Sequence, residues 1–354
     1  MKRAQFTLAV ILSLSCVPIA AADTWKFLVY GDSRASSGGG INTTILTELA
    51  NQTLNEHPAF VLFPGDLVGT GGLSIFGDWK TIMLPVYNAG IGVCPVAGNH
   101  DVGDLTDFKR IFISPLASSP FSGASNVVID STTADGRSYS FNYRNALFLG
   151  LDNYANGSTS THAVNQTFVN ARLTARVAAT TPLVFAFDHE PAFKPGQDTG
   201  LEANAVARNA FWQSLKNAGC REFFAGHDHI YAHAELLDSP SDGDANNDVH
   251  QVVVGTAGAP LYTTSYSGNT GNWTVLPISH DDTHYGYVKV VVDETARTVT
   301  QSWIQRTGTN TFNTAGADFF TYSYPVPEPC TLALAAAGLG WLLVRRSRKG
   351  ARPD

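Results

Sequence analysis

Five short apolar segments, each ending abruptly in a polar cluster, constrain the fold of this 354-residue chain more than any other feature of its sequence. Short apolar runs bounded by glycine are typical of buried β-strands. Polar residues that directly follow such strands lie at the edge of a sheet where α/β proteins bind ligands. We therefore expect function to reside at these strand ends. The strands and clusters are Lys26–Tyr30 before Gly31-Asp32, Phe60–Phe63 before Gly65-Asp66, Val93–Ala97 before Gly98-Asn99, Leu183–Phe187 before Asp188-His189, and Glu222–Ala225 before Gly226-His227.

Segments with helical periodicity separate these strands, notably Thr43–Asn55 and Ala203–Ala218. Alternating strands and helices predict an α/β fold with a layered core. After His229 the pattern changes to strands with little helix, and we expect these to form a second sheet packed on the first, with the helices outside. No repeat or long linker interrupts residues 23–325, which we interpret as one large domain. The later strands are expected at Val249–Val254, Gly286–Asp293, Thr298–Ile304 and Phe319–Tyr324.

The charge of the chain excludes one class of partner. The sequence has 23 Lys and Arg and 30 Asp and Glu, and seven of these bases but only two of the acids lie in residues 1–22 and 326–354, which leaves a net charge of −12 for residues 23–325. So acidic a body does not bind nucleic acid through a basic surface. Phosphate chemistry on this body would need metal ions to supply positive charge.

Residues 1–22 have the order of parts of a secretory signal peptide. Lys2 and Arg3 supply a positive start, residues 6–17 are apolar, and residues 20–22 are three alanines that offer a cleavage site. We therefore expect the chain to be exported from the cytoplasm.

Residues 326–354 also have three parts: Val326-Pro327-Glu328-Pro329, an apolar stretch over 330–344, and a basic cluster over 345–349. The apolar stretch is shorter than the roughly 20 residues of a comfortable membrane span. This tail resembles the PEP-CTERM sorting signal of Gram-negative bacteria. The resemblance implies recognition by an exosortase, association with the membrane during sorting, and a final location at the cell surface or outside the cell. A plain C-terminal membrane anchor, with a short transmembrane helix, is the alternative.

The two cysteines of the body are expected to be buried free thiols, because Cys94 and Cys220 both adjoin predicted strands.

An acidic segment, Asp242 to Asp248, has the alternate spacing of the first half of a calcium loop. It lacks the downstream glutamate of such a loop, so we interpret it as solvated surface.

The five strand ends bring together six side chains that suit metal ions. Carboxylate oxygens and imidazole nitrogens are ligands for borderline and hard metals such as Zn, Mn and Fe. His227 and His229 lie two residues apart, a spacing that directs both rings to one side of an extended loop, where they can reach two neighbouring ions. One carboxylate can bridge two ions, an arrangement used for the hydrolysis of phosphate esters. The six candidate ligands are Asp32, Asp66, Asn99, His189, His227 and His229.

The ordered clusters resemble the five sequence blocks of the calcineurin-like metallophosphoesterases, which include the purple acid phosphatases. The blocks are Gly31-Asp32, Gly65-Asp66, Gly98-Asn99-His100-Asp101, His189 with Pro191, and Gly226-His227-Asp228-His229. The resemblance implies a four-layer fold, in which a sandwich of two β-sheets is flanked by helices.

The same resemblance implies a role for each residue. Asp66 bridges two divalent or mixed-valence ions, Asp32 and His229 bind the first ion, and Asn99, His189 and His227 bind the second. A metal-bound hydroxide attacks the phosphorus of a phosphate mono- or diester in line. His100, oriented by Asp101, protonates the leaving oxygen or steadies its charge.

Two positions depart from the family pattern. Many members have a histidine two residues after the first aspartate, where this chain has Arg34, and purple acid phosphatases have a tyrosine three residues after the second, where it has Gly69. Arg34 cannot bind a cation, because guanidinium stays protonated, but it can contact a substrate phosphate. An ordinary salt bridge is the other interpretation of Arg34. Without the tyrosine, a purple iron centre is not expected and the metal stays open.

Two other functions are weighed against this hypothesis. Gly31-Asp32-Ser33 and a late Asp281 and His284 resemble the GDSL-type serine esterases, with Ser33 as nucleophile, His284 as base and Asp281 as its orienting group. The missing ligand of the first metal instead suggests a surface binding protein on a phosphoesterase fold that has lost catalysis. Tyr262 is expected to pack at the rim of the cleft.

Overall fold

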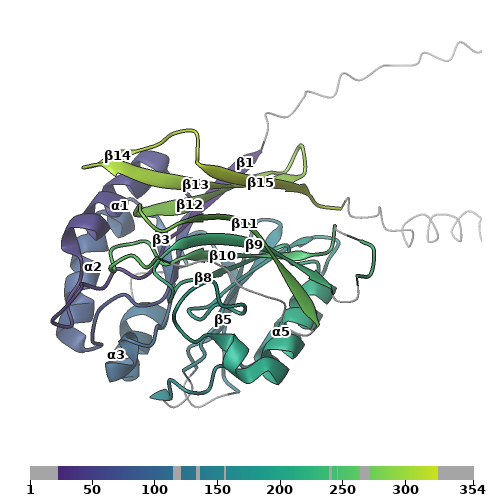
Figure 1. Cartoon of the computed structure of the whole chain (residues 1–354), viewed down its shortest axis with the longest axis horizontal. Helices are drawn as coiled ribbons and strands as arrows, with labels where there is room; N and C mark the ends of the chain where they lie inside the picture. Colours follow the sequence, from purple (N-terminus) through teal and green to yellow (C-terminus); the bar gives the residue numbers. More distant parts are fainter. Residues whose placement is uncertain are drawn as a thin grey trace, which may run out of the picture.

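Two mixed β-sheets pack face to face, and helices cover their outer faces (Figure 1). The first sheet has the strand order β14-β13-β12-β1-β2-β3, with β15 beside β13, and the second has the order β11-β9-β10-β8-β7-β6-β5-β4. The computed structural model describes residues 23–114, 121–132, 136–154, 157–238, 241–244, 246–263 and 272–325.

Each sheet is built around parallel strands, and antiparallel strands extend it on at least one side. In the first sheet β1, β2 and β3 are parallel, and in the second β6, β7, β8 and β10 are parallel. The first sheet comprises β1 (Thr24–Val29), β2 (Phe60–Pro64), β3 (Gly92–Val96), β12 (Gly286–Asp293), β13 (Thr298–Gly308), β14 (Thr311–Phe312) and β15 (Asp318–Ser323). The second comprises β4 (Ser125–Ile129), β5 (Tyr139–Tyr143), β6 (Ala146–Gly150), β7 (Leu183–Phe187), β8 (Glu222–Ala225), β9 (Tyr231–Asp238), β10 (Val249–Val254) and β11 (Trp273–Asp281).

The longer helices lie on opposite sides of the sandwich. Figure 1 shows α1 (Thr43–Glu56) and α2 (Leu73–Asn88) on one side and α5 (Ala205–Asn217) on the other, and α4 (Gln166–Ala175) packs with α5. An asparagine directly before α1, α4 and α5 accepts a backbone N–H of the first turn through its side chain, which favours helix initiation there. Shorter helical turns are η1 (Asp101–Asp104), α3 (Leu105–Phe108), η2 (Lys109–Ile113) and η4 (Leu201–Asn204).

Two residues of β2 that point to opposite faces of the sheet show why four layers form. In β2 the Phe60 ring lies 5.0 Å from that of Phe148 in the opposite sheet, whereas the Phe63 ring lies 5.1 Å from Trp79 of α2. Successive side chains of a strand point to opposite faces, so a strand apolar throughout is buried on both sides. A sheet of such strands needs one cover from the other sheet and one from helices.

The structure confirms the α/β sandwich and most of the expected strands, including the bounds of β7, β8, β10 and β12. The expectation that strands after His229 form a separate second sheet is wrong. β10 pairs with β8, whereas β12 pairs antiparallel with β1 along its whole length, from Thr24 opposite Asp293 to Val29 opposite Val288. Apolar alternation identifies a strand and its buried face, but it does not identify the strand beside it.

The predictions for the cysteines and for the acidic segment agree with the structure. Within the described residues, Cys94 and Cys220 are buried and are not joined in a disulfide, as predicted. Asp242 is exposed and bonds to the ammonium group of Lys216, in keeping with a solvated acidic segment. The predicted signal peptide and sorting tail lie outside the described residues. Within the described ranges, no helix has the length and apolar character needed to cross a bilayer.

A buried acid joins the two sheets. Glu222 of β8 is fully buried and accepts a hydrogen bond of 3.2 Å from the hydroxyl of Tyr322 in β15. Burial raises the pKa of Glu222 from its usual 4.5 to about 8. The folded protein therefore keeps the proton on Glu222 through a pH range in which the unfolded chain releases it.

We predict that this proton makes stability depend on pH. Between about pH 5 and pH 8 the unfolded chain gains stability relative to the folded one, by up to about 1.4 kcal/mol per pH unit, so the free energy of unfolding falls as the pH rises. The isosteric Glu222→Gln variant should lose much of this fall and unfold at a higher temperature than the parent at pH 8. Thermal unfolding at pH 5, 6.5 and 8 measures the difference, and parallel curves for the two proteins would contradict it.

Candidate metal centre

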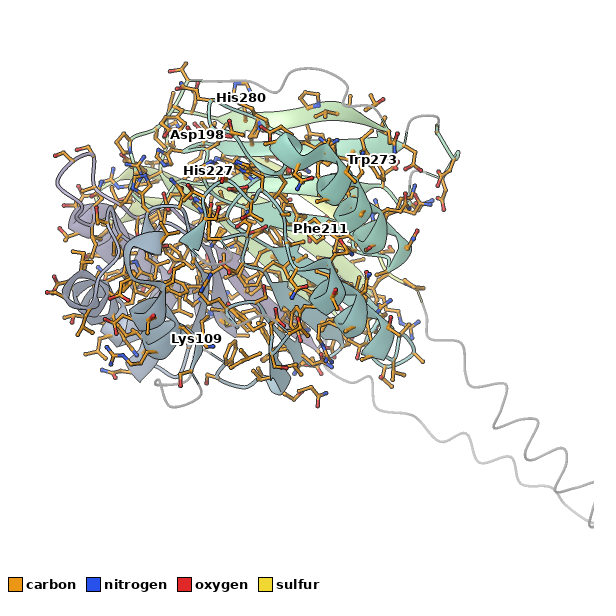
Figure 2. All side chains as sticks on the ribbon, turned by 90° about the horizontal axis from the view of Figure 1, so that it is seen from below. Lys109, Asp198, Phe211, His227, Trp273 and His280 are labelled. Carbon is orange, nitrogen blue, oxygen red and sulfur yellow. The ribbon has the colours of Figure 1, made fainter. Side chains whose placement is uncertain are left out.

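The six predicted metal ligands converge where the parallel strands of both sheets end. Asp32, Asp66 and Asn99 follow β1, β2 and β3 of the first sheet, and the three histidines follow β7 and β8 of the second. They surround or underlie a cavity of about 120 Å³ (Figure 2, where Asp198 and His227 are labelled). Its lining residues are Arg34, Asp66, Asn99, His100, Asp198, His227, His229 and Tyr262.

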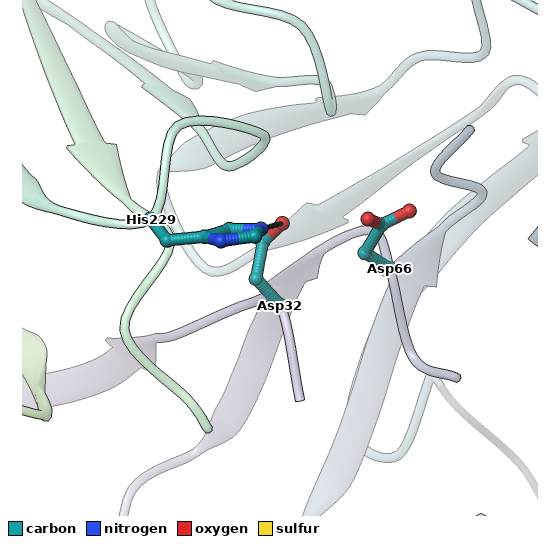
Figure 3. A group of neighbouring side chains, drawn as sticks. All are labelled: Asp32, Asp66 and His229. Carbon is teal, nitrogen blue, oxygen red and sulfur yellow. Dashed lines mark ion pairs between the residues drawn. The ribbon is translucent and has the colours of Figure 1, made fainter. Parts of the chain in front are cut away.

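One group of ligand atoms, which we call site 1, consists of Asp32, Asp66 and His229 (Figure 3). One ligand atom from each residue lies within 4.8 Å of the other two, and all three side chains are buried. Nε2 of His229 is 3.7 Å from Oδ1 of Asp32. The spacing leaves room for an ion between the three groups.

A second group, site 2, surrounds Nε2 of His189. That nitrogen lies 3.0 Å from Oδ1 of Asn99, 3.2 Å from Nδ1 of His227 and 3.5 Å from Oδ1 of Asp66. Ligand atoms about 2.0 to 2.1 Å from a tetrahedral zinc ion lie about 3.3 Å from one another. The three distances from His189 are close to that value, and Asp66 is shared by the two sites.

Backbone carbonyls fix which nitrogen of each imidazole faces the cavity. A carbonyl only accepts, so the ring nitrogen beside it carries the hydrogen and the other nitrogen keeps a lone pair. The donated bonds run from Nδ1 of His189 to Pro64 (2.8 Å), from Nε2 of His227 to Thr199 (3.1 Å) and from Nδ1 of His229 to Pro260 (2.9 Å). The lone pairs thus lie on the nitrogens that form sites 1 and 2.

This arrangement fits metal ions. The lone pairs of His189 and His227 face each other across 3.2 Å, a repulsive contact that a shared cation would turn into an attractive one. Burial lowers the pKa of His189 to about 3 and that of His229 to about 3, and burial together with His189 lowers that of His227 to about 4. All three rings are therefore neutral near pH 7, the form that binds a metal.

The two carboxylates also need a cation. Asp32 and Asp66 are buried, and burial is the main cause that raises the pKa of each, with the neighbouring charge of Asp66 adding to the effect on Asp32. Bound cations reverse this effect by stabilising the ionised form. Asp32 is aimed by the backbone N–H of His227, which donates to its carboxylate at 3.1 Å.

The glycines of the motifs are required by close approach as well as by turning. A Cβ atom at Gly98 would overlap the Asp66 carboxylate, and one at Gly226 would overlap the Asp32 carboxylate. Asp66 and His227 themselves adopt left-handed backbone conformations, with φ of 49° and 73°. Residues other than glycine rarely adopt such backbone conformations, and those that do are concentrated at functional sites.

The predicted contact between His100 and Asp101 is wrong. The buried Asp101 carboxylate accepts backbone N–H groups of Leu67, Val68 and Gly98 and so braces the loops that carry the ligands. Nδ1 of His100 instead donates to the carbonyl of Gly69 at 2.9 Å. Nε2 of His100 is left toward the cavity, 3.9 Å from the Asp66 carboxylate.

Arg34 lies within the site. Its Nε forms an ion pair with Oδ2 of Asp66 at 3.5 Å, in agreement with the salt-bridge interpretation, and within the described part of the chain this buried nitrogen has no hydrogen-bond partner. Gly69, the other departure, has no room for a side chain, because its Cβ would lie 2.7 Å from the backbone of Gly39. The loop that follows Arg34 therefore occupies the space that a side chain at position 69 would need.

The serine esterase alternative is contradicted by the environment of Ser33. Its hydroxyl is fully buried, donates to the carbonyl of Leu67 at 2.7 Å and accepts the indole N–H of Trp79 at 2.9 Å. His284 and Asp281 do pair, at 3.0 Å, but Ser33 bonds to neither.

One residue of the cavity had no motif to identify it. Asp198 lines the cavity from a loop whose backbone N–H groups, including its own, donate to Asp228. It was missed because the position of this loop is set by tertiary contacts rather than by local sequence. Tyr262, by contrast, was expected to pack at the rim, and its ring does pack on His229, with 4.3 Å between centroids.

Comparisons with known proteins agree with this geometry. A family model for calcineurin-like phosphoesterases matches residues 26–231. No curated protein sequence matches the chain significantly.

Solved structures share the fold at low identity. A purple acid phosphatase from yellow lupin (Lupinus luteus) has a TM-score of 0.62 and 15% identity over 86% of this chain, which spans about half (54%) of that protein. GAP50, the anchor in the inner membrane complex of Plasmodium, has a TM-score of 0.55 and 14% identity over 85% of this chain and 89% of its own. A dimetal phosphatase from Danio rerio has a TM-score of 0.51 and 15% identity over 85% of this chain and 99% of its own.

The family model covers more than half of the chain and spans all five motifs. The retained donor set argues against a binding protein that has lost catalysis. The chain belongs to the calcineurin-like phosphoesterase family.

Proposed function

We propose that this protein is an exported phosphoesterase that uses two metal ions to hydrolyse phosphate mono- or diesters by in-line displacement at phosphorus. The observation that supports the proposal most strongly is the convergence of neutral imidazole lone pairs and carboxylates on sites 1 and 2. When bound, the ions would activate water and neutralise the charge of the phosphoryl oxygens.

The residues of the cavity divide the remaining work. Asp32, Asp66 and His229 would hold the first ion, and Asp66 would hold the second together with Asn99, His189 and His227. Arg34 lines the cavity with an Nε that has no hydrogen-bond partner among the described residues, and it is suited to bind phosphoryl oxygens. The cavity of about 120 Å³ admits little more than the phosphoryl group, so the rest of the ester would lie outside it.

His100 is suited to protonate the leaving oxygen. Its Nδ1 donates to the Gly69 carbonyl, which orients the ring so that Nε2 faces the cavity. Asp101 acts indirectly, because its carboxylate accepts backbone N–H groups of the loops that carry His100 and Asp66.

The donor set is oxygen and nitrogen only, which suits Zn, Mn or Fe. The close packing of Gly69 on Gly39 leaves no place for a phenolate ligand at that position. We therefore propose divalent ions rather than a purple iron centre.

We expect hydrolysis to require the metals and to be independent of the esterase candidates. Removing metal from the purified protein with a chelator should abolish hydrolysis of p-nitrophenyl phosphate and of its bis ester, and Zn²⁺ or Mn²⁺ should restore it. Asp66→Ala should lower kcat by at least about 10²- to 10³-fold, because both sites lose a ligand. His284→Ala should retain activity. Hydrolysis that persists after chelation would contradict the proposal.

We predict that the effect of His100 depends on the leaving group. His100→Ala should keep the metal content and lower kcat by about 10²- to 10⁴-fold for an alkyl phosphate, whose leaving oxygen needs a proton. The loss should be smaller for p-nitrophenyl phosphate, whose leaving group needs little protonation. Equal losses for the two substrates would assign His100 to charge stabilisation, and a loss of metal would overturn its assignment altogether.

The proposed export rests on the sequence of residues 1–22 and 326–354. A Gram-negative cell would remove the signal peptide, and an exosortase would process the tail while the protein is at the membrane, before it reaches the surface or the medium. Mass spectrometry of the native protein should find an N-terminus at Asp23 and a C-terminus before Asp354. A native protein that begins at Met1 would refute the signal peptide, and a mature surface form that ends at Asp354 would refute processing of the tail.

A further inference from the structure

The two metal sites are unequal in their protein ligands. Site 2 offers four, and three of them lie 3.0 to 3.5 Å from Nε2 of the fourth, His189. Site 1 offers three, whose ligand atoms all lie within 4.8 Å of one another. A site with fewer protein ligands binds an ion more weakly.

Arg34 places a permanent positive charge beside the shared ligand. Its Nε is 3.5 Å from Oδ2 of Asp66, and the side chain is largely buried. Interactions between charges are strengthened by burial, so this guanidinium repels a metal ion that approaches Asp66. An ion at site 1 has one protein ligand fewer to offset this repulsion, so we expect its affinity to be the lower of the two.

The backbone holds Arg34 in this place. Residues 34 and 41 form an isolated antiparallel bridge, and the N–H of Ala35 donates to the carbonyl of Gly40 at 3.0 Å. The same loop packs Gly39 against Gly69, which excludes a further ligand from position 69. The same loop therefore both places the charge of Arg34 beside Asp66 and prevents a ligand at position 69.

A phosphate group would remove this penalty. Its oxygens can accept hydrogen bonds from the guanidinium, whose Nε is ion-paired with Asp66 but makes no hydrogen bond within the described residues, and can neutralise its charge. Binding of an anion and of the site 1 ion should then assist each other, because coupling between two ligands is reciprocal.

We propose that the protein loads its metals in order: one ion binds tightly at site 2, and a second binds site 1 weakly until phosphate engages Arg34. This inference rests on the proposed metal centre and adds a dependence of activity on free metal. The enzyme would be complete only where both metal and phosphate ester are plentiful.

Calorimetric titration of the metal-free full chain with Mn²⁺, with and without inorganic phosphate, tests the proposal. We expect one tight equivalent and a second that binds about 10- to 100-fold more weakly. Phosphate should strengthen the second event and leave the first nearly unchanged. Two equivalents of equal affinity in the absence of phosphate would overturn the proposal.

Three variants separate the charge of Arg34 from the missing ligand. Arg34→Gln removes the charge and should narrow the gap between the two affinities and abolish the effect of phosphate. Arg34→His also adds a ligand and should narrow the gap further. Arg144→Gln, which changes an arginine paired with Asp23 elsewhere, should titrate like the parent. An unchanged gap in Arg34→Gln would overturn the role of Arg34.

The test is distinct from that of hydrolysis. Metal stoichiometry is read on protein whose folding has been checked by thermal unfolding, and activity is measured separately on the same samples. Ordered loading in an inactive protein would refute the proposed function alone. Equal affinities in an active protein would refute the ordered loading alone, and absence of metal binding would refute both.

Discussion

The structure keeps mutually repulsive metal-binding groups close together in a buried site, and the rest of the fold makes this possible. Two imidazole lone pairs face each other across 3.2 Å, and two carboxylates lie beside them in surroundings that favour their protonated forms. They stay together because five strand ends from two sheets meet there, backbone carbonyls fix each ring, and glycines such as Gly98 let the carboxylates approach. The stability of the sandwich outside the site sustains this arrangement, as is usual for functional sites.

Much of this could be predicted because strand ends and ligands are local features of the sequence. Each apolar run specifies a buried strand, and the residue after it must appear at the sheet edge. The sheet to which a late strand belongs is not local: β12 and β10 look alike as apolar runs, yet one pairs with β1 and the other with β8. That choice depends on register and on packing between sheets, which apolar alternation does not encode.

The finer errors at the site have the same origin. His100 and Asp101 are adjacent, which suggested a pair, but successive residues in a turn point in different directions. The Asp101 carboxylate turns inward to three backbone N–H groups, and the Gly69 carbonyl holds His100 instead. Asp198 had no motif because its place is set by Asp228, thirty residues along the chain. Direct ligands follow strand ends, whereas the groups that orient them come from elsewhere in the fold.

Charge explains why these orienting details matter for function. The body carries a net charge of −12, so a phosphate ester approaches an unfavourable field unless the cavity itself is positive. Apart from the metals, the permanent positive charge at the cavity comes from Arg34, and the carboxylates of Asp66 and Asp198 oppose it. Arg34 is thus both an attraction for the phosphate and a repulsion for the site 1 ion. Because Arg34 interacts with both the phosphate and the site 1 ion, it links the binding of substrate to the completion of the metal centre.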